Sequence, residues 1–340
     1  MTRIFCRHVL LMAAVAIVGA VSSASAQFSI QDLGTLPGGD FSVALGINSR
    51  GHVVGRATTA TGAEHAFLWS RGTMVDLGTL PGDSFSSASA INDRGQIAGV
   101  SGSLSGGHAV LWRRGTIIDL GTVPGGRQSS ALALNNRGQV VGQAETESGE
   151  FHAFLWEGGV MSDLGALPGE NFSVAYAIND RGQVVGESQA PTGERHAFLW
   201  QDGTMIELGP LPGGANGVAF GINNRGQVVG QSDTDPFFGF PHAVVWTDGV
   251  IADLGVLPGG AFSVAVAINN KGEIAGHCDN GITFHACLRR RSGFVDLGAL
   301  PGGPLSSATG INNRGDVVGQ SGTAAGEFRA VLWTKRRPRG

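Results

Sequence analysis

Short apolar stretches separated by turn residues follow one another along most of the chain, and nearly the same string occurs seven times. The copy over Asp163–Met205 is representative. An acidic residue followed by Leu-Gly marks each copy, with steps of 44, 43, 44, 44, 46 and 43 residues. These marks are Asp32, Asp76, Asp119, Asp163, Glu207, Asp253 and Asp296. A fixed period of this length is typical of a solenoid, a propeller or an array.

Each copy contains four short strand patterns, and no sustained helical period occurs outside the N-terminus. The patterns are exemplified by Met74–Gly78, Ser173–Ile178, Gly182–Gly186 and His196–Trp200. All are bounded by Gly, Pro, Asn or Asp, which commonly end strands. The four patterns therefore predict four strands in each copy.

Tight turns predict how these strands pair. An Asn-x-Arg-Gly turn such as Asn179–Gly182 joins the second and third strands, and a short turn such as Gln201–Gly203 joins the fourth strand to the next Asp-Leu-Gly. Both lengths suit hairpins. Each copy is thus an antiparallel meander, and Leu-Pro-Gly-Gly forms the crossing to the next copy.

Four-stranded units of about 40–50 residues are propeller blades. We therefore predict an all-β fold, a seven-bladed β-propeller. The chain starts with a lone Asp-Leu-Gly strand, Phe28–Gly34, and ends with a lone fourth-strand pattern, Arg329–Trp333. The N-terminal strand should pair with the C-terminal one, complete the last blade and close the ring.

Small and large residues recur at fixed strand positions. Alanine holds one position of the second strand, and Gly or Ala follows two residues later, as in Ala44 with Gly46. Because strand side chains alternate, we expect both positions on one face, where neighbouring blades approach. Tryptophans of the fourth strand should fill the wider outer space between blades, at Trp69, Trp112, Trp156, Trp200, Trp246 and Trp333.

The N-terminal segment has the organisation of a secretory signal peptide over residues 1–26. Arg3 and Arg7 precede the apolar run Val9–Val21, and Ala24–Ala26 form an Ala-Ser-Ala cleavage site. The alternative is an uncleaved anchor, although the run is short for a membrane span. We expect a propeller domain over 27–334, a basic tail over 335–340, and export to the periplasm or outside the cell.

Charge and cysteine content restrict the remaining possibilities. Without Arg3 and Arg7, 21 basic residues face 27 acidic ones, a net charge near −6, which argues against nucleic-acid binding. We expect a monomer without a membrane span in the mature chain.

Cys278 and Cys287 lie across one hairpin of the sixth copy. An exported chain permits a disulfide between them, and two free buried thiols are the alternative.

A histidine begins the fourth strand in six copies, and Arg329 replaces it in the seventh. A metal or catalytic role is one reading, but one histidine per blade would form a wide ring rather than a cluster of ligands. We favour a structural bond to the nearby Asp-Leu-Gly carboxylate. The histidines are His65, His108, His152, His196, His242 and His285.

The composite motif resembles a known family. His-Ala-Phe at His65–Phe67, His152–Phe154 and His196–Phe198, together with Asp-Leu-Gly-x-Leu-Pro-Gly-Gly and Ile-Asn-x-x-Gly-x-Val-Val-Gly, is similar to the bacterial HAF-repeat extracellular proteins. The resemblance covers essentially the whole mature chain, although some copies read His-Ala-Val, His-Ala-Cys or Arg-Ala-Val. It implies secretion and a repeat architecture, and it brings no catalytic residues.

One face of the predicted ring combines the crossings with loops of variable sequence between the third and fourth strands. Such loops commonly carry binding. The longest, Ser232–Pro241, contains Phe237, Phe238 and Phe240, which form a contact patch or fold over one another. Asp233 and Asp235 in this loop could bind calcium, but two carboxylates are a weak signal.

The opposite face carries a basic residue at the same turn position of every copy. These residues would ring the axial channel and attract an anion, or they are solvated turn positions. They are Arg50, Arg94, Arg137, Arg181, Arg225, Lys271 and Arg314.

Catalytic, cofactor-binding and metal-binding motifs are not found in the sequence. Two function classes remain. We favour a secreted binding or scaffold module for a protein or glycan partner. The alternative is a propeller enzyme, such as a glycan hydrolase or lyase, with its site at the channel mouth.

Overall fold

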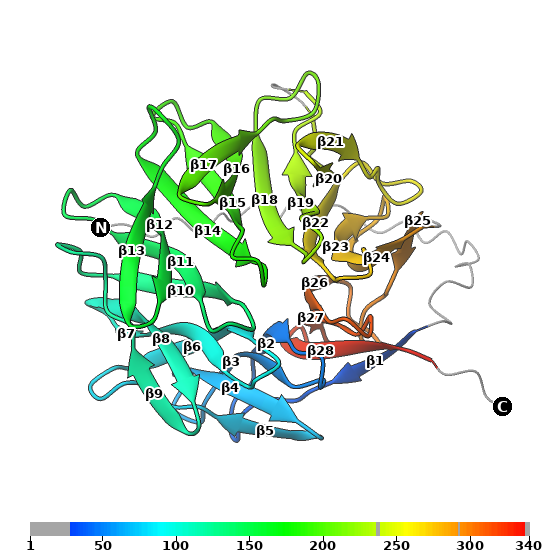
Figure 1. Ribbon diagram of the computed structural model, residues 1–340. Helices are drawn as coiled ribbons and strands as arrows, with labels where there is room; N and C mark the ends of the chain where they lie inside the picture. Colours follow the sequence, from blue (N-terminus) through cyan, green and yellow to red (C-terminus); the bar gives the residue numbers. More distant parts are fainter. Residues whose placement is uncertain (1–27, 236–238, 292, 337–340) are drawn as a thin grey trace.

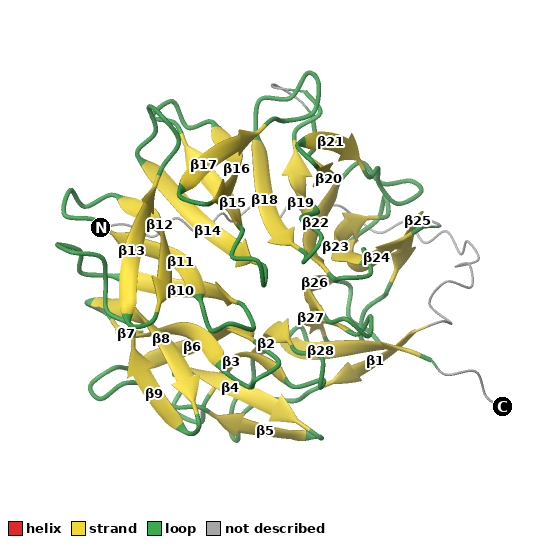
Figure 2. Cartoon of the chain, in the orientation of Figure 1, coloured by secondary structure: helices red, strands yellow, loops and turns green. Residues whose placement is uncertain are grey.

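A ring of seven four-stranded antiparallel sheets surrounds a central axis (Figure 1). The computed structural model describes residues 28–235, 239–291 and 293–336. Within these residues the secondary structure consists of strands and loops only, without a helix (Figure 2). The sequence-based prediction of a seven-bladed β-propeller is therefore confirmed.

We number the blades in chain order. Blade 1 has β2 (Ser42–Ile47), β3 (Val53–Thr58), β4 (Glu64–Ser70) and β5 (Thr73–Asp76); blade 2 has β6 (Phe85–Ile91), β7 (Ile97–Ser103), β8 (Gly106–Arg113) and β9 (Thr116–Asp119). Blade 3 has β10 (Ser129–Leu134), β11 (Val140–Glu145), β12 (Phe151–Glu157) and β13 (Val160–Gly165); blade 4 has β14 (Phe172–Ile178), β15 (Val184–Gln189), β16 (Arg195–Gln201) and β17 (Thr204–Leu208). Blade 5 has β18 (Gly217–Ile222), β19 (Val228–Ser232), β20 (His242–Thr247) and β21 (Val250–Asp253); blade 6 has β22 (Ser263–Ile268), β23 (Ile274–Asp279), β24 (Phe284–Arg290) and β25 (Gly293–Asp296). Blade 7 has β26 (Ser306–Ile311), β27 (Val317–Gly322), β28 (Phe328–Lys335) and the N-terminal β1 (Phe28–Asp32).

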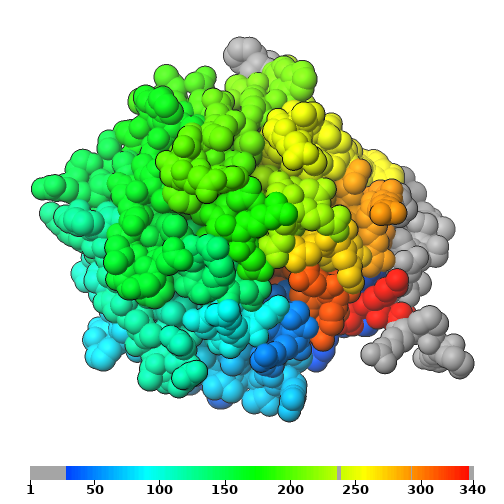
Figure 3. Space-filling model, in the orientation of Figure 1, coloured from blue at the N-terminus to red at the C-terminus, as the bar shows by residue number. Residues whose placement is uncertain are grey.

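The two ends of the chain close the ring. β1 runs antiparallel to β28, with Phe28 opposite Lys335 and Asp32 opposite Val331. The blue N-terminal and red C-terminal segments therefore meet in the space-filling view (Figure 3). Lys335 belongs to this sheet, so the strand reaches one residue into the segment predicted to be the tail. β1 thus completes the fourth, outermost strand of blade 7, as the repeat phase predicts.

Within each blade, with strands counted from the innermost outward rather than from Asp-Leu-Gly, the Asn-x-Arg-Gly turns join the first and second strands. In blade 1 the Asn48 carbonyl accepts a hydrogen bond from Gly51 N–H at 3.0 Å, and Gly51 has a φ of 82°, which favours glycine. We call the side of the ring that carries these turns the turn face. The crossings and the loops between the second and third strands of each sheet lie on the opposite side, the variable-loop face. There, a Cβ on Gly39 of the crossing would lie 1.9 Å from the Thr58 carbonyl oxygen.

The innermost strand of every blade carries a β-bulge, which lies between Ala44 and Gly46 in blade 1. Across it Ala44 pairs with Gly55, and Gly46 pairs with Val54. Because Gly55 and Val54 are consecutive, their partners point to opposite faces of the sheet. The prediction that the two small positions share a face is therefore wrong. Ala44 packs toward blade 7, whereas a Cβ on Gly46 would lie 3.1 Å from the Cα of Ala90 in blade 2.

The hydrophobic core is divided into clusters at the seven interfaces between neighbouring blades. The tryptophans pack in the outer part of these interfaces, and Trp333 is fully buried. The indole N–H of Trp112 donates to the Leu77 carbonyl at 3.1 Å. In blade 6, where Arg289 replaces tryptophan, its guanidinium Nε donates to the equivalent Leu254 carbonyl at 3.4 Å. The tryptophans therefore fill the outer interblade space, as predicted.

A serine at the start of the innermost strand links six blades to the blade before. In blade 2, Ser86 Oγ accepts a hydrogen bond from Ala66 N–H at 2.9 Å and donates one to the Gly78 carbonyl at 2.7 Å. The same two bonds are made by Ser42, Ser129, Ser173, Ser263 and Ser306. We call these residues the interblade serines. Blade 5 has Gly217 at this position, so it lacks the link to blade 4.

Cys278 of β23 and Cys287 of β24 form a disulfide, with an S–S distance of 2.08 Å and a Cα–Cα distance of 6.0 Å. Both residues are fully buried, and Leu257 packs against them. The equivalent positions of blade 1 hold Ala57 and Phe67. The disulfide therefore takes the place of an alanine–phenylalanine pair in the blade that also lacks the tryptophan.

Candidate functional site

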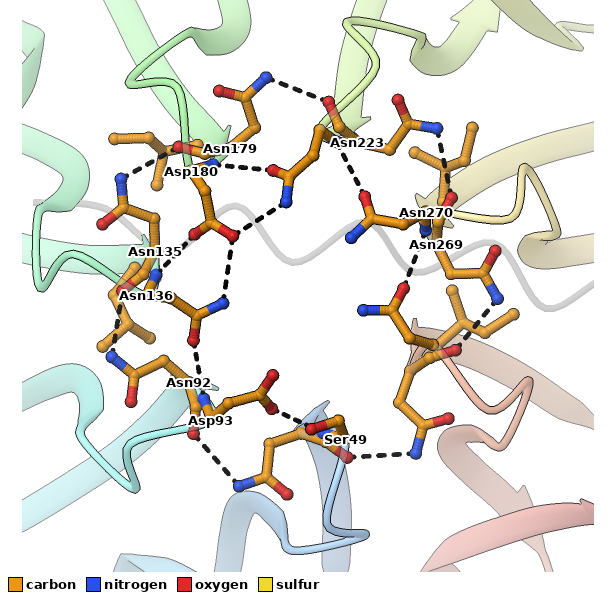
Figure 4. A pocket seen from close by; sticks show the side chains of 18 of the residues that line it. Ser49, Asn92, Asp93, Asn135, Asn136, Asn179, Asp180, Asn223, Asn269 and Asn270 are labelled. Atoms are coloured by element: carbon orange, nitrogen blue, oxygen red, sulfur yellow. Dashed lines mark hydrogen bonds between the residues drawn. The ribbon is translucent and has the colours of Figure 1, made fainter.

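A closed belt of asparagines surrounds the channel on the turn face (Figure 4). Within each turn, the asparagine Oδ1 accepts hydrogen bonds from backbone N–H groups two and four residues later, as Asn48 does from Arg50 and His52 at 3.0 Å. Its Nδ2 donates to the backbone carbonyl of the equivalent asparagine in the next blade, and Asn312 completes the circle to Asn48. The members are Asn48, Asn92, Asn135, Asn179, Asn223, Asn269 and Asn312, with Nδ2–O distances of 3.0–3.2 Å. The belt thus joins all seven blades.

The residue after each belt asparagine lines the mouth of the channel, a cavity of about 180 Å³. These residues are Ser49, Asp93, Asn136, Asp180, Asn224, Asn270 and Asn313. Asp180 accepts side-chain hydrogen bonds from Asn136 at 3.2 Å and Asn224 at 2.9 Å. Partial burial alone would raise the pKa of the Asp180 carboxyl, but these amide hydrogen bonds outweigh it and hold the pKa below its usual value. The mouth is therefore polar, and carboxamides dominate it.

The seven basic turn residues are all exposed, and each follows a mouth residue in sequence. The arginines among them that have contacts bond through their guanidinium groups to residues of the same turn or of the next one. Arg137 Nη2 donates to the Gln139 side chain at 2.7 Å, and Arg314 pairs with Asp316 at 2.8 Å. Arg225 bonds to the Asn270 carbonyl of the next blade. The residues before them, rather than the basic residues, line the mouth, and anion binding by the basic ring stays a prediction.

The long loop predicted as a contact patch is described only in part, because Phe237 and Phe238 lie outside the described residues. Phe240 is 62% exposed. Asp233 accepts a hydrogen bond from the Asn216 side chain at 2.7 Å, and Thr234 Oγ1 donates to the Phe240 carbonyl at 3.3 Å. Asp233 is thus bonded to the crossing of its own blade. In the described part of the chain, neither Asp233 nor Asp235 belongs to a group of three or more side chains suited to a metal.

Five of the repeated histidines bond to the Asp-Leu-Gly carboxylate of the same blade through Nδ1, as predicted. The distances are 2.8–3.0 Å for the pairs His65–Asp76, His108–Asp119, His152–Asp163, His242–Asp253 and His285–Asp296. The carboxylate also accepts the N–H of the glycine two residues on, as Asp119 does from Gly121 at 2.8 Å. Burial would raise the pKa of Asp296, but hydrogen bonds from His285 and Gly298 lower it.

Two copies replace this pair. In blade 4 the equivalent carboxylate is Glu207, and His196 bonds instead to the buried Glu170 of the preceding crossing. In blade 7, Arg329 bonds to Glu327 at 2.6 Å and to the Asp40 carbonyl. Both exceptions keep the strand that carries the histidine position, β16 or β28, bonded to a neighbouring segment.

Each of two neighbouring blades has a pocket beside its histidine–aspartate pair on the variable-loop face. The pocket of blade 2 is about 400 Å³ and is lined by Leu80, Pro81, Asp83, Ser101, Ser103, Ser105, Gly106, Gly107, His108, Asp119 and Arg127. The pocket of blade 3 is about 540 Å³ and is lined by Val123, Pro124, Thr146, Glu147, Ser148, His152 and Asp163. We call them the blade pockets. Both have an aliphatic wall from the crossing, hydroxyls from the variable loop, and the histidine–aspartate pair.

The sequence pattern identifies the histidine–aspartate pairs but not the pockets beside them. A separate pocket forms in a blade because the crossing, the variable loop and the outer strand meet there. A signal is present in three variable loops, where two hydroxyl residues stand two positions apart and bond to each other: Thr59 with Thr61, Ser103 with Ser105, and Thr146 with Ser148.

Among the described residues there is no helix that could span a membrane.

No family model matches the chain, and no curated protein matches it in sequence. Solved structures match it in shape. A puromycin-hydrolyzing peptidase from Mycobacterium tuberculosis has a TM-score of 0.57 at 13% identity, over 92% of this chain and 53% of the peptidase. This chain thus spans about half the length of that peptidase.

Two further structures match across almost their whole length. The β-propeller domain of the trilobed protease from Pyrococcus furiosus has a TM-score of 0.56 at 9% identity, over 89% of this chain and 97% of that domain. A streptogramin B lyase has a TM-score of 0.55 at 12% identity, over 93% of this chain and all of the lyase. At these identities the likeness shows the fold alone: the chain is a β-propeller of a shape found in proteins of different activities.

Proposed function

We propose that the protein is an exported binding module of the HAF-repeat type that holds hydroxyl-rich chains, such as glycans, in the blade pockets of the variable-loop face. The observation that carries the proposal is the repetition of one pocket in blades 2 and 3, with the crossing proline, the loop hydroxyls and the histidine–aspartate pair in common. The two pockets give two similar sites in neighbouring blades at a spacing fixed by the repeat, which suits a polymer of repeating units. Linked weak sites bind such a polymer far more tightly than one site alone.

The chemistry of the linings supports a saccharide ligand. Asp83 and Asp119 can accept hydrogen bonds from sugar hydroxyls, whereas Arg127 can donate them. Leu80 and Pro81 offer an aliphatic surface to the C–H face of a sugar ring. Small-ligand sites commonly combine an apolar wall with a few such polar groups, and both pockets lie in the usual volume range of about 300–1,000 Å³.

The disulfide supports export, because such bonds persist mainly in oxidising compartments. The N-terminal 27 residues lie outside the described residues, so the signal peptide stays a prediction. N-terminal sequencing of the protein secreted by its host would test cleavage after Ala26. A mature chain starting at Met1 would contradict it.

A glycan array with the mature protein tests the ligand class. We expect binding to polysaccharides that rises with chain length. The double variant Arg127→Ala with Glu147→Ala should weaken this binding at least tenfold. The matched control is Arg113→Ala with Glu157→Ala, which makes the same charge changes at exposed outer hairpins.

Two results would contradict the proposal. Equal loss of binding in the pocket variant and its control would place the site elsewhere on the ring. Capture of surface proteins that persists after their glycans are removed, together with a silent array, would favour a protein partner.

A further inference from the structure

A second axial cavity, of about 220 Å³, lies next to the mouth toward the variable-loop face. It shares the isoleucines Ile47, Ile91, Ile222, Ile268 and Ile311 with the mouth. Its other lining residues come from the bulges of the innermost strands and the small residues beside them. We call this cavity the axial throat.

The bulge residue is the varied position of an otherwise repetitive strand. It lies between an alanine and a Gly or Ala, and the seven residues are Leu45, Ser89, Leu132, Tyr176, Phe220, Val266 and Thr309. A bulge redirects a side chain, and here it directs six of the seven into the lining of the throat. The small flanking positions pack against the neighbouring blades in every repeat, whereas only some bulge residues reach a neighbouring blade, as Thr309 and Tyr176 do. Variation held on a rigid frame is typical of a recognition surface.

The throat has two unlike walls. Leu132, Phe220 and Val266 of blades 3, 5 and 6 form an apolar wall. Ser89 of blade 2 and Thr309 of blade 7 bring hydroxyl side chains to the other wall, on either side of the apolar Leu45 of blade 1, and Thr309 Oγ1 donates to the Ala44 carbonyl at 2.7 Å. Ser89 lies across the ring from Phe220 and Val266, and Thr309 already has a backbone partner, so Ser89 is the hydroxyl that we assign to a ligand.

Tyr176 of blade 4 holds the aromatic part of the apolar wall in place. Its ring centroid lies 5.4 Å from that of Phe220, with the planes tilted by 50°. Its hydroxyl donates to the buried carboxylate of Glu187 at 2.8 Å, and Arg195 lies 3.7 Å from the other carboxylate oxygen. This arrangement fixes Phe220 before any ligand arrives, which lowers the entropy cost of binding.

We propose that the axial throat binds a small, flat, mostly apolar molecule with one polar edge, of the class of indoles and simple phenols. The ring would lie against Phe220, and the polar edge would face Ser89. The cavity equals the liquid volume of about seven water molecules, at about 30 Å³ each. This volume fits one small ring system and is too small for the glycan chains assigned to the blade pockets.

Tyr176 is the only tyrosine of the chain, so it gives a single reporter signal. Protein labelled with ring-¹³C tyrosine is titrated with indole and followed by NMR. We expect a saturable shift of the Tyr176 ring signal, because a ring bound on Phe220 changes its environment. N-methylindole, which lacks the N–H donor, should bind about 2–10-fold more weakly, the range expected for one hydrogen bond. A Tyr176 signal that does not move up to the solubility limit of indole overturns the proposal.

Two variants locate the site. Ser89→Trp fills the throat and should abolish the shift, while Ser162→Trp makes the same change on the exposed outer strand β13 and should leave it unchanged. Phe220→Leu keeps an apolar side chain but removes the ring face, and it should weaken indole binding at least fivefold. Wild-type affinity in either throat variant overturns the proposal. The variants of Arg127 and Glu147 should not affect indole, so this test is independent of the glycan pockets.

Discussion

Gly217 is the place where one substitution should strengthen the ring. In the other six blades an interblade serine bonds to an alanine N–H of the preceding blade at 2.8–2.9 Å. A Cβ on Gly217 would lie 3.6 Å from the Cβ of Ala197 and 3.9 Å from Ala197 N and from Trp246 Cζ2. These are ordinary contact distances, so Gly217→Ser should place its hydroxyl beside the Ala197 N–H without displacing a neighbour.

The expected gain can be estimated from two contributions. One new hydrogen bond contributes about 0.5–1.5 kcal/mol, and replacing glycine in a strand contributes roughly 0.5–1 kcal/mol through the lower entropy of the unfolded chain. The Gly209 carbonyl already accepts the Trp246 indole N–H at 2.9 Å, so we count no second full bond. The free energy of unfolding should rise by about 1–2.5 kcal/mol. With an unfolding entropy of about 2.1 cal/mol/K per residue over about 300 residues, Tm should rise by roughly 2–4 °C.

Calorimetry of three variants separates these contributions. Gly217→Ala adds the Cβ without the hydroxyl and should give only the entropic part of the gain. Ser86→Ala makes the reverse change in blade 2, leaves the Ala66 N–H without its partner, and should cost about 1–3 kcal/mol. If Gly217→Ser melts no higher than Gly217→Ala, the interblade serine does not stabilise the ring through its hydrogen bonds.

Three further changes test other parts of the fold. Deleting Phe28–Asp32 should lower Tm sharply because it opens the sheet of blade 7; an unchanged melt would contradict closure by β1. Reducing the Cys278–Cys287 disulfide should cost about 2–3 kcal/mol for its short loop, measured by denaturation with and without reductant; equal midpoints would contradict this. Burial lowers the pKa of His277 below its ordinary 6.5, so protons bind the unfolded chain preferentially and stability falls as pH decreases from 7 to 5. His277→Gln should flatten that fall in pH-dependent melts, and an unchanged slope would disprove the role of His277.

Most of the architecture is predictable from local patterns. The Asn-x-Arg-Gly turns, the glycines with positive φ and the strand alternation act over a few residues, and their repetition gives the number of blades. The phase of the repeat predicts that Phe28–Gly34 completes the last blade, as the pairing of β1 with β28 shows. The histidine–aspartate bonds are predictable for the same reason, because both partners belong to one hairpin.

The candidate sites are only partly predictable. The variable-loop face is identified by sequence variation, but the blade pockets depend on how three segments of a blade meet. The bulge adds one residue to the innermost strand, and it reverses the face of every side chain beyond it. Alternation alone therefore assigns Ala44 and Gly46 to the same face. Strand alternation also gives no special role to the bulge position between Ala44 and Gly46, although the bulge residues line the axial throat.

The sequence by itself determined the blade, its four strands, its turns and the sevenfold repetition, because each depends on interactions between residues close in the chain. Only the tertiary structure decided what the repetition assembles. The Asn312 side chain reaches the Asn48 carbonyl across 264 residues, and the mouth residues meet only when the ring is closed. Closure is a property of all seven interfaces together, so no single repeat contains the information about what faces the axis.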